Sequence, residues 1–150
     1  MHNLNFTIPG QFVSRGTVYW PKGGMDPQKY IDWQETFRKT LLEKTESDEL
    51  RSALRNKDSK LFIEITVLGF SKSIVALDLD NIAKTVFDNI TKTLVPKEKG
   101  SRTPNWEDRH FWKAKISKFI DEEDPENAGC HIRFRNEIVS KFKTMYPIQS

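Results

Sequence analysis

"KLFIEITVLGF", residues 60 to 70, is the stretch that decides the fold. It is rich in β-branched and aromatic residues, which favour strands because their side chains pack well on a pleated surface. Gly and Pro do not interrupt it until Gly69. The stretch therefore predicts a β-strand, and the elements on either side of it can be placed relative to this strand.

The residues after this strand change from an extended to a helical pattern. Residues 74–79 are predicted to be a short extended segment, and Asp80 or Asn81 can cap a helix that runs to about Leu94. Apolar side chains fall within one arc of about 140° on that helix, and Lys84 and Asp88 lie on the opposite, polar side. The apolar positions are Ile82, Val86, Phe87, Ile90 and Leu94.

The residues before the strand predict one more strand and two helices. "LNFTI", residues 4 to 8, alternates and stops at Pro9-Gly10, as a strand ending in a turn does. Asp26-Pro27 can open a helix, with Asp as N-cap and Pro at the first helical position. "SDELRSALRNK", residues 47 to 57, predicts a second helix. The apolar face of the first helix consists of Tyr30, Trp33, Phe37, Leu41 and Leu42.

Two further strands are expected near the C-terminus. "HFWKAKISKFI", residues 110 to 120, alternates strongly, with Phe111, Lys113 and Lys115 on one side of a lysine-bearing strand. "CHIRFR", residues 130 to 135, is the last strand. The order of strands and helices predicts an α+β fold for residues 1–150, a single small domain with a mixed β-sheet packed against helices.

Composition narrows the class of protein without identifying it. The 150 residues are 37% hydrophobic and 30% charged, with a net charge of +3, which fits a nucleic-acid partner and equally an ordinary basic protein. Cys130 is the only cysteine, so an intrachain disulfide is excluded, and a buried, inert thiol is expected. No signal peptide and no apolar run of about 18 residues is present, so we expect a cytoplasmic protein without a membrane partner.

Acidic residues are grouped unusually in "LDLDNIAKTVFDNI", residues 77 to 90. Asp78 and Asp80 would project to the same side of an extended segment. Two carboxylates about 4 Å apart repel by roughly 4 kcal/mol at an effective dielectric constant of 20. A cation, a bound metal or plain solvation must therefore offset the repulsion.

A second acidic pair, Glu107-Asp108, precedes the lysine-bearing strand. If the helix packs on the sheet, that strand could start beside Asp78 and Asp80, and three or four oxygen ligands would converge. Sites with only oxygen ligands suit Mg²⁺ or Mn²⁺. Lys84 could then steady an attacking water or the charge that develops on a phosphate.

Each of these features also has a simpler explanation. Asp78, Asp80 and Asn81 can form a helix cap with an Asx-turn, and Lys84–Asp88 can be a surface pair that contributes little. Glu107-Asp108 can be a solvated turn. The lysines of the strand can simply face water.

The whole pattern resembles the RusA-type Holliday junction resolvases of bacteria and phages. The family signature is an acid, any residue, Asp-Asn, an apolar residue, any residue, Lys and, four residues later, Asp. It is matched here from Asp78 to Asp88, and an acidic pair then precedes a strand. The early strand and the aromatic helix follow the family's order as well. The chain departs from the family in Ala76-Leu77 before the motif, in Glu107 at the first acidic position and in a longer basic loop.

The resemblance implies metal-dependent cleavage of four-way DNA junctions by a homodimer, through paired symmetric nicks. It implies that Asp78, Asp80 and Asp108 bind Mg²⁺, or alternatively Mn²⁺, and that Lys84 is the catalytic lysine. Asp88 and Glu107 would be supporting acids. The candidates for contacts with DNA phosphates are Lys97, Lys99, Arg102, Arg109, Lys113, Lys115 and Lys118.

Other functions fit the same residues. One alternative is a non-catalytic, structure-specific DNA-binding module, in which the acids only cap a helix. Another is a nuclease that acts on other branched DNA. A third is a structural or partner-binding protein with a solvated acidic cluster, which would show no salt-dependent affinity for DNA.

Overall fold

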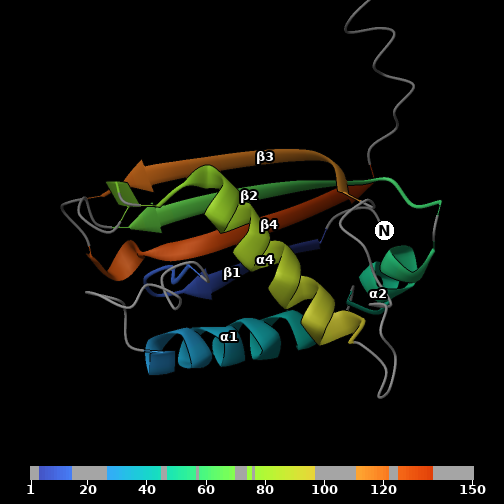
Figure 1. The fold of residues 1–150 in the computed structure, drawn as a ribbon, viewed down its shortest axis with the longest axis horizontal. Coiled ribbons are helices and arrows are strands. Elements are labelled where there is room, and N and C mark those ends of the chain that lie inside the picture. Colours follow the sequence, from blue (N-terminus) through green and yellow to red (C-terminus); the bar gives the residue numbers. More distant parts are fainter. Residues whose placement is uncertain are drawn as a thin grey trace, which may run out of the picture.

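The structure, a computed structural model, describes residues 4–14, 27–44, 47–56, 58–69, 74–75, 77–96, 111–121 and 125–136 (Figure 1). The strands in this part of the chain are β1 (Leu4–Pro9), β2 (Leu61–Gly69), β3 (Phe111–Ile120) and β4 (Gly129–Asn136). The helices are α1 (Pro27–Leu42), α2 (Ser47–Arg55), α4 (Leu79–Leu94) and a short 3₁₀ helix, η3 (Pro125–Asn127).

The strands form one mixed sheet in the order β1-β4-β2-β3. β4 pairs antiparallel with both β1 and β2, and β3 pairs parallel with β2. A parallel pair needs a long crossover connection, and α4 lies in the connection between β2 and β3. The α+β fold of one small domain, with a mixed sheet packed against helices, is thus confirmed.

The core lies between the sheet and the helices that cover one of its faces (Figure 1). Alternate residues of β2 point to this face, and Ile63, Ile65 and Val67 are fully buried there. Val86 and Ile90 of α4 are fully buried in the same cluster. Each such side chain contributes about 1.5–3 kcal/mol by leaving water, so the apolar arc predicted for α4 is what fixes the helix to the sheet.

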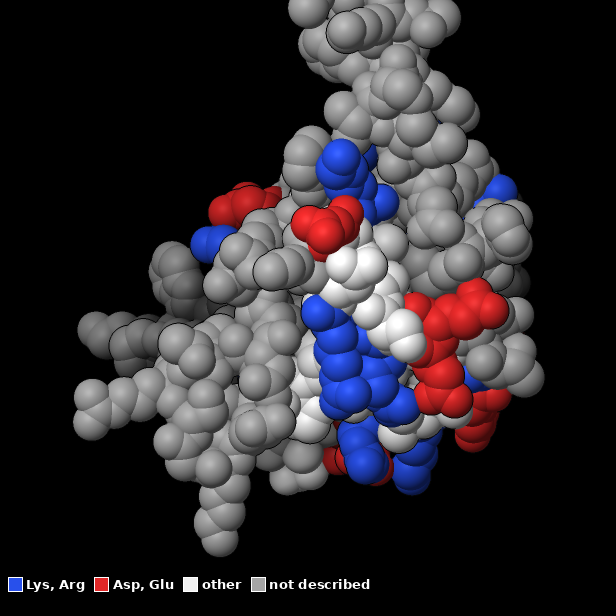
Figure 2. All heavy atoms as spheres, turned by 90° about the vertical axis from the view of Figure 1, so that its right-hand side faces the viewer, with Lys and Arg blue, Asp and Glu red and all other residues white. Residues whose placement is uncertain are grey.

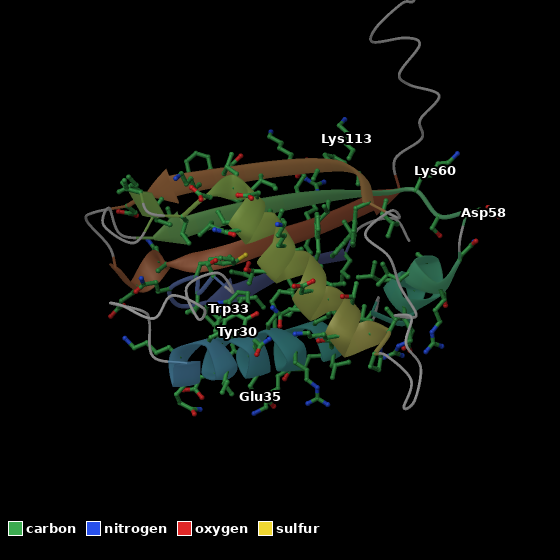
Figure 3. The ribbon with its side chains drawn as sticks, viewed as in Figure 1. Tyr30, Trp33, Glu35, Asp58, Lys60 and Lys113 are labelled. Carbon is green, nitrogen blue, oxygen red and sulfur yellow. The ribbon has the colours of Figure 1, made fainter. Side chains whose placement is uncertain are left out.

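The predicted apolar face of α1 is confirmed except at its end. Tyr30 and Trp33 are buried and point from α1 toward the sheet, whereas Glu35 points away from it (Figure 3). Leu41 is fully buried, but Leu42 is 41% exposed, so the prediction that Leu42 belongs to the apolar face is wrong. Consecutive helical residues are about 100° apart, so only one of these two leucines can face the core.

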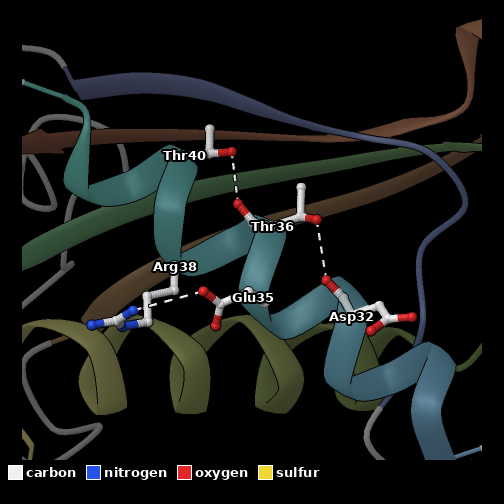
Figure 4. Close-up of polar contacts among 5 residues, drawn as sticks. All are labelled: Asp32, Glu35, Thr36, Arg38 and Thr40. Carbon is white, nitrogen blue, oxygen red and sulfur yellow. Dashed lines mark hydrogen bonds and ion pairs between the residues drawn. The ribbon is translucent and has the colours of Figure 1, made fainter.

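The outer face of α1 carries contacts within the helix (Figure 4). The Thr36 hydroxyl donates to the Asp32 carbonyl oxygen at 3.1 Å, and the Thr40 hydroxyl donates to that of Thr36 at 2.7 Å. Arg38 and Glu35 form an ion pair at 3.8 Å in which both side chains are more than half exposed. An exposed pair of this kind contributes about 0–1 kcal/mol, so this face is a solvated surface.

A buried polar link joins α1 to α4. Asn89 is 4% exposed, and its amide donates to the Thr85 carbonyl oxygen at 2.7 Å. The Gln34 amide in turn donates to Asn89 Oδ1 at 3.0 Å. Because a buried amide without partners costs about 1–3 kcal/mol, this link favours one alignment of the two helices.

The end of β1 and the start of β4 agree with the sequence patterns. Gly10, at the end of β1, has φ +89°, a conformation that glycine adopts without steric cost, and its N–H donates to the Ala128 carbonyl oxygen at 2.9 Å. Cys130 in β4 is fully buried, as predicted, and this burial raises the pKa of its thiol to about 12.

Among the described residues, no helix has the length and apolar character that spanning a membrane requires.

Candidate functional site at the start of helix α4

Helix α4 begins at Leu79, and Asp78 occupies its N-cap position. Asp78 has extended backbone angles (φ −79°, ψ 144°), and its side chain makes no capping hydrogen bond. The prediction of an extended segment over residues 74–79 is wrong, because Ile74 and Val75 are helical and the Leu77 N–H donates to the Ile74 carbonyl oxygen at 3.1 Å. The predicted N-cap at Asp80 or Asn81 is also wrong, because the observed N-cap, Asp78, lies two or three residues earlier.

This start of the helix changes the geometry expected for the two acids. Asp78 lies at the cap and Asp80 at the second helical position, so the alternation of an extended chain does not align their side chains. Both residues are exposed. Water and the positive end of the helix dipole, which stabilises a carboxylate by about 0.3–1 kcal/mol, both offset their repulsion.

The other charged residues of the motif lie further along α4. Lys84 is exposed, one turn after Asp80, and Asp88 is half-buried one turn later. Both are on the side of the helix away from the fully buried Ile82 and Val86. The polar side predicted for this helix is therefore confirmed, and Lys84 is free to reach a ligand bound near the helix start.

The parallel register places the end of β3, not its start, beside these acids. The Lys118 ammonium donates to the carbonyl oxygens of Ile74 at 3.1 Å and Leu77 at 2.8 Å. These are the residues that lead directly into Asp78. Lys118 thus anchors the segment before the helix to the sheet, whereas the sequence predicted only a contact with DNA for it.

The expectation that the lysine-bearing strand starts beside Asp78 and Asp80 is wrong. Phe111, the first residue of β3, pairs with Leu61 at the start of β2 and stacks on Phe87 of α4 at 4.6 Å between ring centroids. Phe87 is about 10 Å along the helix from Asp80. The predicted ligands Asp108 and Glu107 lie outside the described residues, as do Lys97, Lys99, Arg102 and Arg109.

The lysine-bearing face of β3 is confirmed, but it does not include Phe111. The register shifts between Leu61 and Phe62, which pair with Phe111 and Lys113, so one extra residue lies between these two partners. The shift turns Phe111 toward α4 and Lys113 toward the other face of the sheet, where its ammonium lies 4.7 Å from the centre of the Phe62 ring. Lys113 and Lys115 are exposed on this face.

The sequence patterns missed a group of exposed apolar residues at the same end of the sheet. Val75, Leu79, Phe119 and Ile120 are exposed to between 46% and 69%. The alternation of β3 and the amphipathic pattern of α4 gave no reason to expect apolar side chains in water. The parallel pairing of β2 with β3 and the Lys118 contacts place Ile120 on the same side of the sheet as the acids, whereas alternation turns Phe119 to the opposite side.

The opposite end of the molecule, with α2 and the starts of β2 and β3, has a mixed surface. Figure 2 looks onto this end and shows basic side chains across its middle, with acidic side chains around them. Asp58 and Lys60 lie toward this end, far from the start of α4 (Figure 3). The described residues of this end therefore do not form a uniformly basic surface.

The donor set at the start of α4 suits a hard cation. Within the described ranges, no group of three or more His, Cys, Asp or Glu residues converges in a metal-binding arrangement. Asp78 and Asp80 supply only carboxylate oxygens, and Mg²⁺ is commonly held by one or two carboxylates together with waters and substrate phosphates. The two residues thus fit the protein's share of a Mg²⁺ site that a phosphate completes.

Comparisons with known proteins assign no family. No family model matches the chain, and no curated protein matches it.

Proposed function

We propose that the protein is a metal-dependent endodeoxyribonuclease that resolves four-way DNA junctions by paired symmetric nicks, as RusA-type resolvases do. The observation that carries the proposal is the pair of exposed carboxylates at the cap and first turn of α4, with exposed Lys84 one turn further on. The Lys118 contacts hold the segment before this pair against the sheet, so the carboxylates start from a fixed backbone. A fixed backbone at these positions reduces the cost of ordering the side chains around a cation and a phosphate.

In the proposed site, Asp78, Asp80 and Asp108 would hold Mg²⁺, with Mn²⁺ as a substitute. The bound ion would supply Lewis-acid activation of water and neutralise charge on the cleaved phosphodiester. Lys84 would orient the attacking water or stabilise the phosphate in the transition state. Asp88 and Glu107 would act as supporting acids around these groups.

The rest of the proposal concerns the DNA and the assembly. Lys113 and Lys115 are exposed on one face of β3, where they would contact phosphates and position DNA without reading its sequence. Paired nicks need two sites, so the active form would be a homodimer. The protein would act in DNA recombination and repair in the bacterial cytoplasm. It would be encoded by a bacterium or by a phage.

One experiment tests the activity directly. Labelled four-way junction, replication fork and linear duplex are incubated with the protein in Mg²⁺ or in EDTA, and the products are separated on a denaturing gel. We expect Mg²⁺-dependent nicks at symmetric positions in the junction, and none in EDTA. Asp80→Asn should abolish cleavage but preserve junction binding, while Asp58→Asn, an exposed acid far from the site, should cleave as the wild type does. Cleavage that persists in Asp80→Asn would refute the site.

A second candidate function is favoured by the helix start itself. Because Asp78 and Asp80 are exposed at the positive end of α4, they are accommodated without any cation. The protein would then be a structure-specific DNA-binding module. It would bind the junction with a strong salt dependence and give no Mg²⁺-dependent product on any of the three substrates.

A further inference from the structure

The described helices pack against only one face of the sheet. Alternate strand residues such as Ile63 and Ile132 are fully buried in one cluster with residues of α1, α2 and α4. The strand residues between them point to the opposite side, because successive side chains of a strand alternate. We call this opposite side the open face. Its charged and titratable side chains are Glu64 of β2, Lys113 and Lys115 of β3, and His131 and Arg133 of β4.

The register of the sheet aligns charged side chains of the open face in one row. Arg133 of β4 is directly opposite Glu64 of β2, and Glu64 is opposite Lys115 of β3. Asn5 of β1 completes the row on the other side of Arg133. Neighbouring strands are about 4.8 Å apart, so the row spans about 14 Å. The row is therefore a surface that all four strands build together.

Positive charge exceeds negative charge on the open face. Lys113 and Lys115 are exposed, and Arg133 is half-buried. Among the described strand residues of this face, Glu64 is the only acid. Two such faces would repel each other, so the charge favours a polyanion over a second copy of this chain as the ligand.

The next row of the open face supplies uncharged polar groups. Thr66 of β2 is opposite both His131 of β4 and Ser117 of β3. Thr7 of β1 is opposite His131, and its hydroxyl is hydrogen-bonded to His131 Nδ1 at 2.9 Å. Hydroxyl groups commonly bond to the phosphate and sugar oxygens of DNA. The middle of the face thus presents polar groups, whereas a protein that inserts into a membrane surface presents apolar ones.

Arg133 keeps donor capacity that its neighbours do not use. Its Nη1 lies 4.0 Å from Glu64 Oε2, which is an ion pair but too long for a hydrogen bond. Its Nε is one of two buried side-chain nitrogen or oxygen atoms in the described part of the chain that have no hydrogen-bond partner. A guanidinium that turns outward can donate to two phosphate oxygens at once. An anionic ligand on the open face would therefore satisfy Arg133.

The sheet separates the open face from the two acids of the candidate site. Lys118 points to the opposite side of β3 from Lys115, and its ammonium bonds to the Leu77 carbonyl oxygen, directly before Asp78. Phosphates on the open face would thus have the sheet between them and Asp78 or Asp80. Because β3 is an edge strand, DNA can pass around it from one face to the other.

We propose that the open face holds the phosphate backbone of a DNA arm, with Arg133 as a contact in addition to Lys113 and Lys115. The inference rests on the proposed function for the identity of the polyanion, and it assigns the surface on which the DNA lies away from the cleaved phosphate. Contacts with phosphates carry no sequence information and need no branch. The open face should therefore bind a linear duplex as well as an arm of a junction.

The test measures the affinity of the full chain for a labelled linear duplex and a four-way junction over a range of salt concentrations, in EDTA so that no cleavage occurs. Arg133→Gln and Lys115→Gln should each lower the slope of log affinity against log salt by about 1 on both DNAs. Each should weaken binding about eightfold at roughly 0.1 M salt. Lys39→Gln removes the same charge from an exposed position on α1 and should leave the slope unchanged.

Glu64→Gln should have the opposite effect. It removes the acid that lies between Arg133 and Lys115, so binding to both DNAs should become about threefold tighter. A variant that folds poorly does not gain affinity, so this result is independent of stability. Circular dichroism is recorded for every variant.

The outcomes separate this inference from the proposed function. If Arg133→Gln and Lys115→Gln keep the wild-type slope, the inference is overturned, whether or not the protein cleaves junctions. If both lower the slope but no Mg²⁺-dependent product forms, the inference holds and the nuclease fails. The same variants are mixed with vesicles that contain phosphatidylserine. If they lose affinity for these vesicles and keep it for DNA, the open face binds a membrane surface and the inference is overturned.

Discussion

The contact of Lys118 with the segment before α4 makes a prediction that does not depend on function. Lys118→Met keeps the aliphatic stem and removes the ammonium that donates to the Ile74 and Leu77 carbonyl oxygens. A hydrogen bond that involves a charged group contributes about 1.5–3 kcal/mol when buried. These two are only partly buried, and ordering a lysine side chain costs about 1.5–2 kcal/mol.

The expected net loss is therefore about 1–2 kcal/mol in the free energy of unfolding. For a domain of this size it corresponds to a fall of about 3–6 °C in Tm. Urea denaturation followed by circular dichroism measures the free energy, and a thermal scan measures Tm. Hydrogen exchange should also become faster for a peptide that covers residues 74–82, and remain unchanged in β1.

Lys115→Met is the matched control, because it removes the same charge from an exposed position of the same strand. It should change the free energy of unfolding by less than about 0.5 kcal/mol. If Lys118→Met and Lys115→Met unfold at the same urea concentration, with equal exchange in residues 74–82, then Lys118 does not anchor this segment. The argument that fixes the acids to the sheet would then be wrong.

Other predictions concern the metal, the core and the thiol. Mg²⁺ at about 100 times its Kd should add about 2.7 kcal/mol of stability, and a Tm unchanged by millimolar Mg²⁺ in the wild type would contradict the metal site. Leu41→Ala should cost about 2–5 kcal/mol in urea denaturation and Leu42→Ala less than about 0.5, since only the first is buried. Asn89→Ala should cost about 1–3 kcal/mol by the same assay, because it leaves the Gln34 amide without this partner. Burial raises the pKa of the Cys130 thiol from 9.0 to about 12, so the thiol should resist alkylation until urea unfolds the protein. Because the unfolded thiol ionises at a lower pH than the folded one, Cys130 should lower the free energy of unfolding relative to Cys130→Val as pH rises above 9, and have no such effect below pH 9.

The helices and strands could be predicted because their side chains repeat with clear periods. Ile82, Val86 and Ile90 repeat every four residues, and all three are fully buried on one side of α4. The prediction that Leu42 belongs to the apolar face was wrong, because an apolar residue next to Leu41 is compatible with the helical period, whereas the helix turns this side chain toward water. Local periodicity thus predicts an element well and its last residue poorly.

The arrangement of the candidate site could not be predicted, because it depends on pairing between distant segments. Alternation in β3 cannot reveal the register shift that separates Phe111 from Lys113, since this shift is defined against β2. For the same reason the sequence did not show that Lys118, rather than the start of β3, lies beside the residues before Asp78. The motif supplied the proposed chemistry of the site, and the parallel pairing decides which groups surround it.

The position of β4 in the sheet has a consequence for how the chain reaches its fold. β4 is the last described strand to be synthesised, yet it lies between β1 and β2 and supplies the only sheet partner that β1 has among the described strands. Leu4 pairs with Phe134, so this contact closes a loop of nearly the whole chain, and such distant contacts slow folding. On the ribosome, β2, α4 and β3 can assemble first, while the backbone N–H and C=O groups along the edge of β1 have no strand partner until β4 emerges. A chain that ends before Gly129 would lack β4, and β1 would then have no partner among the described strands.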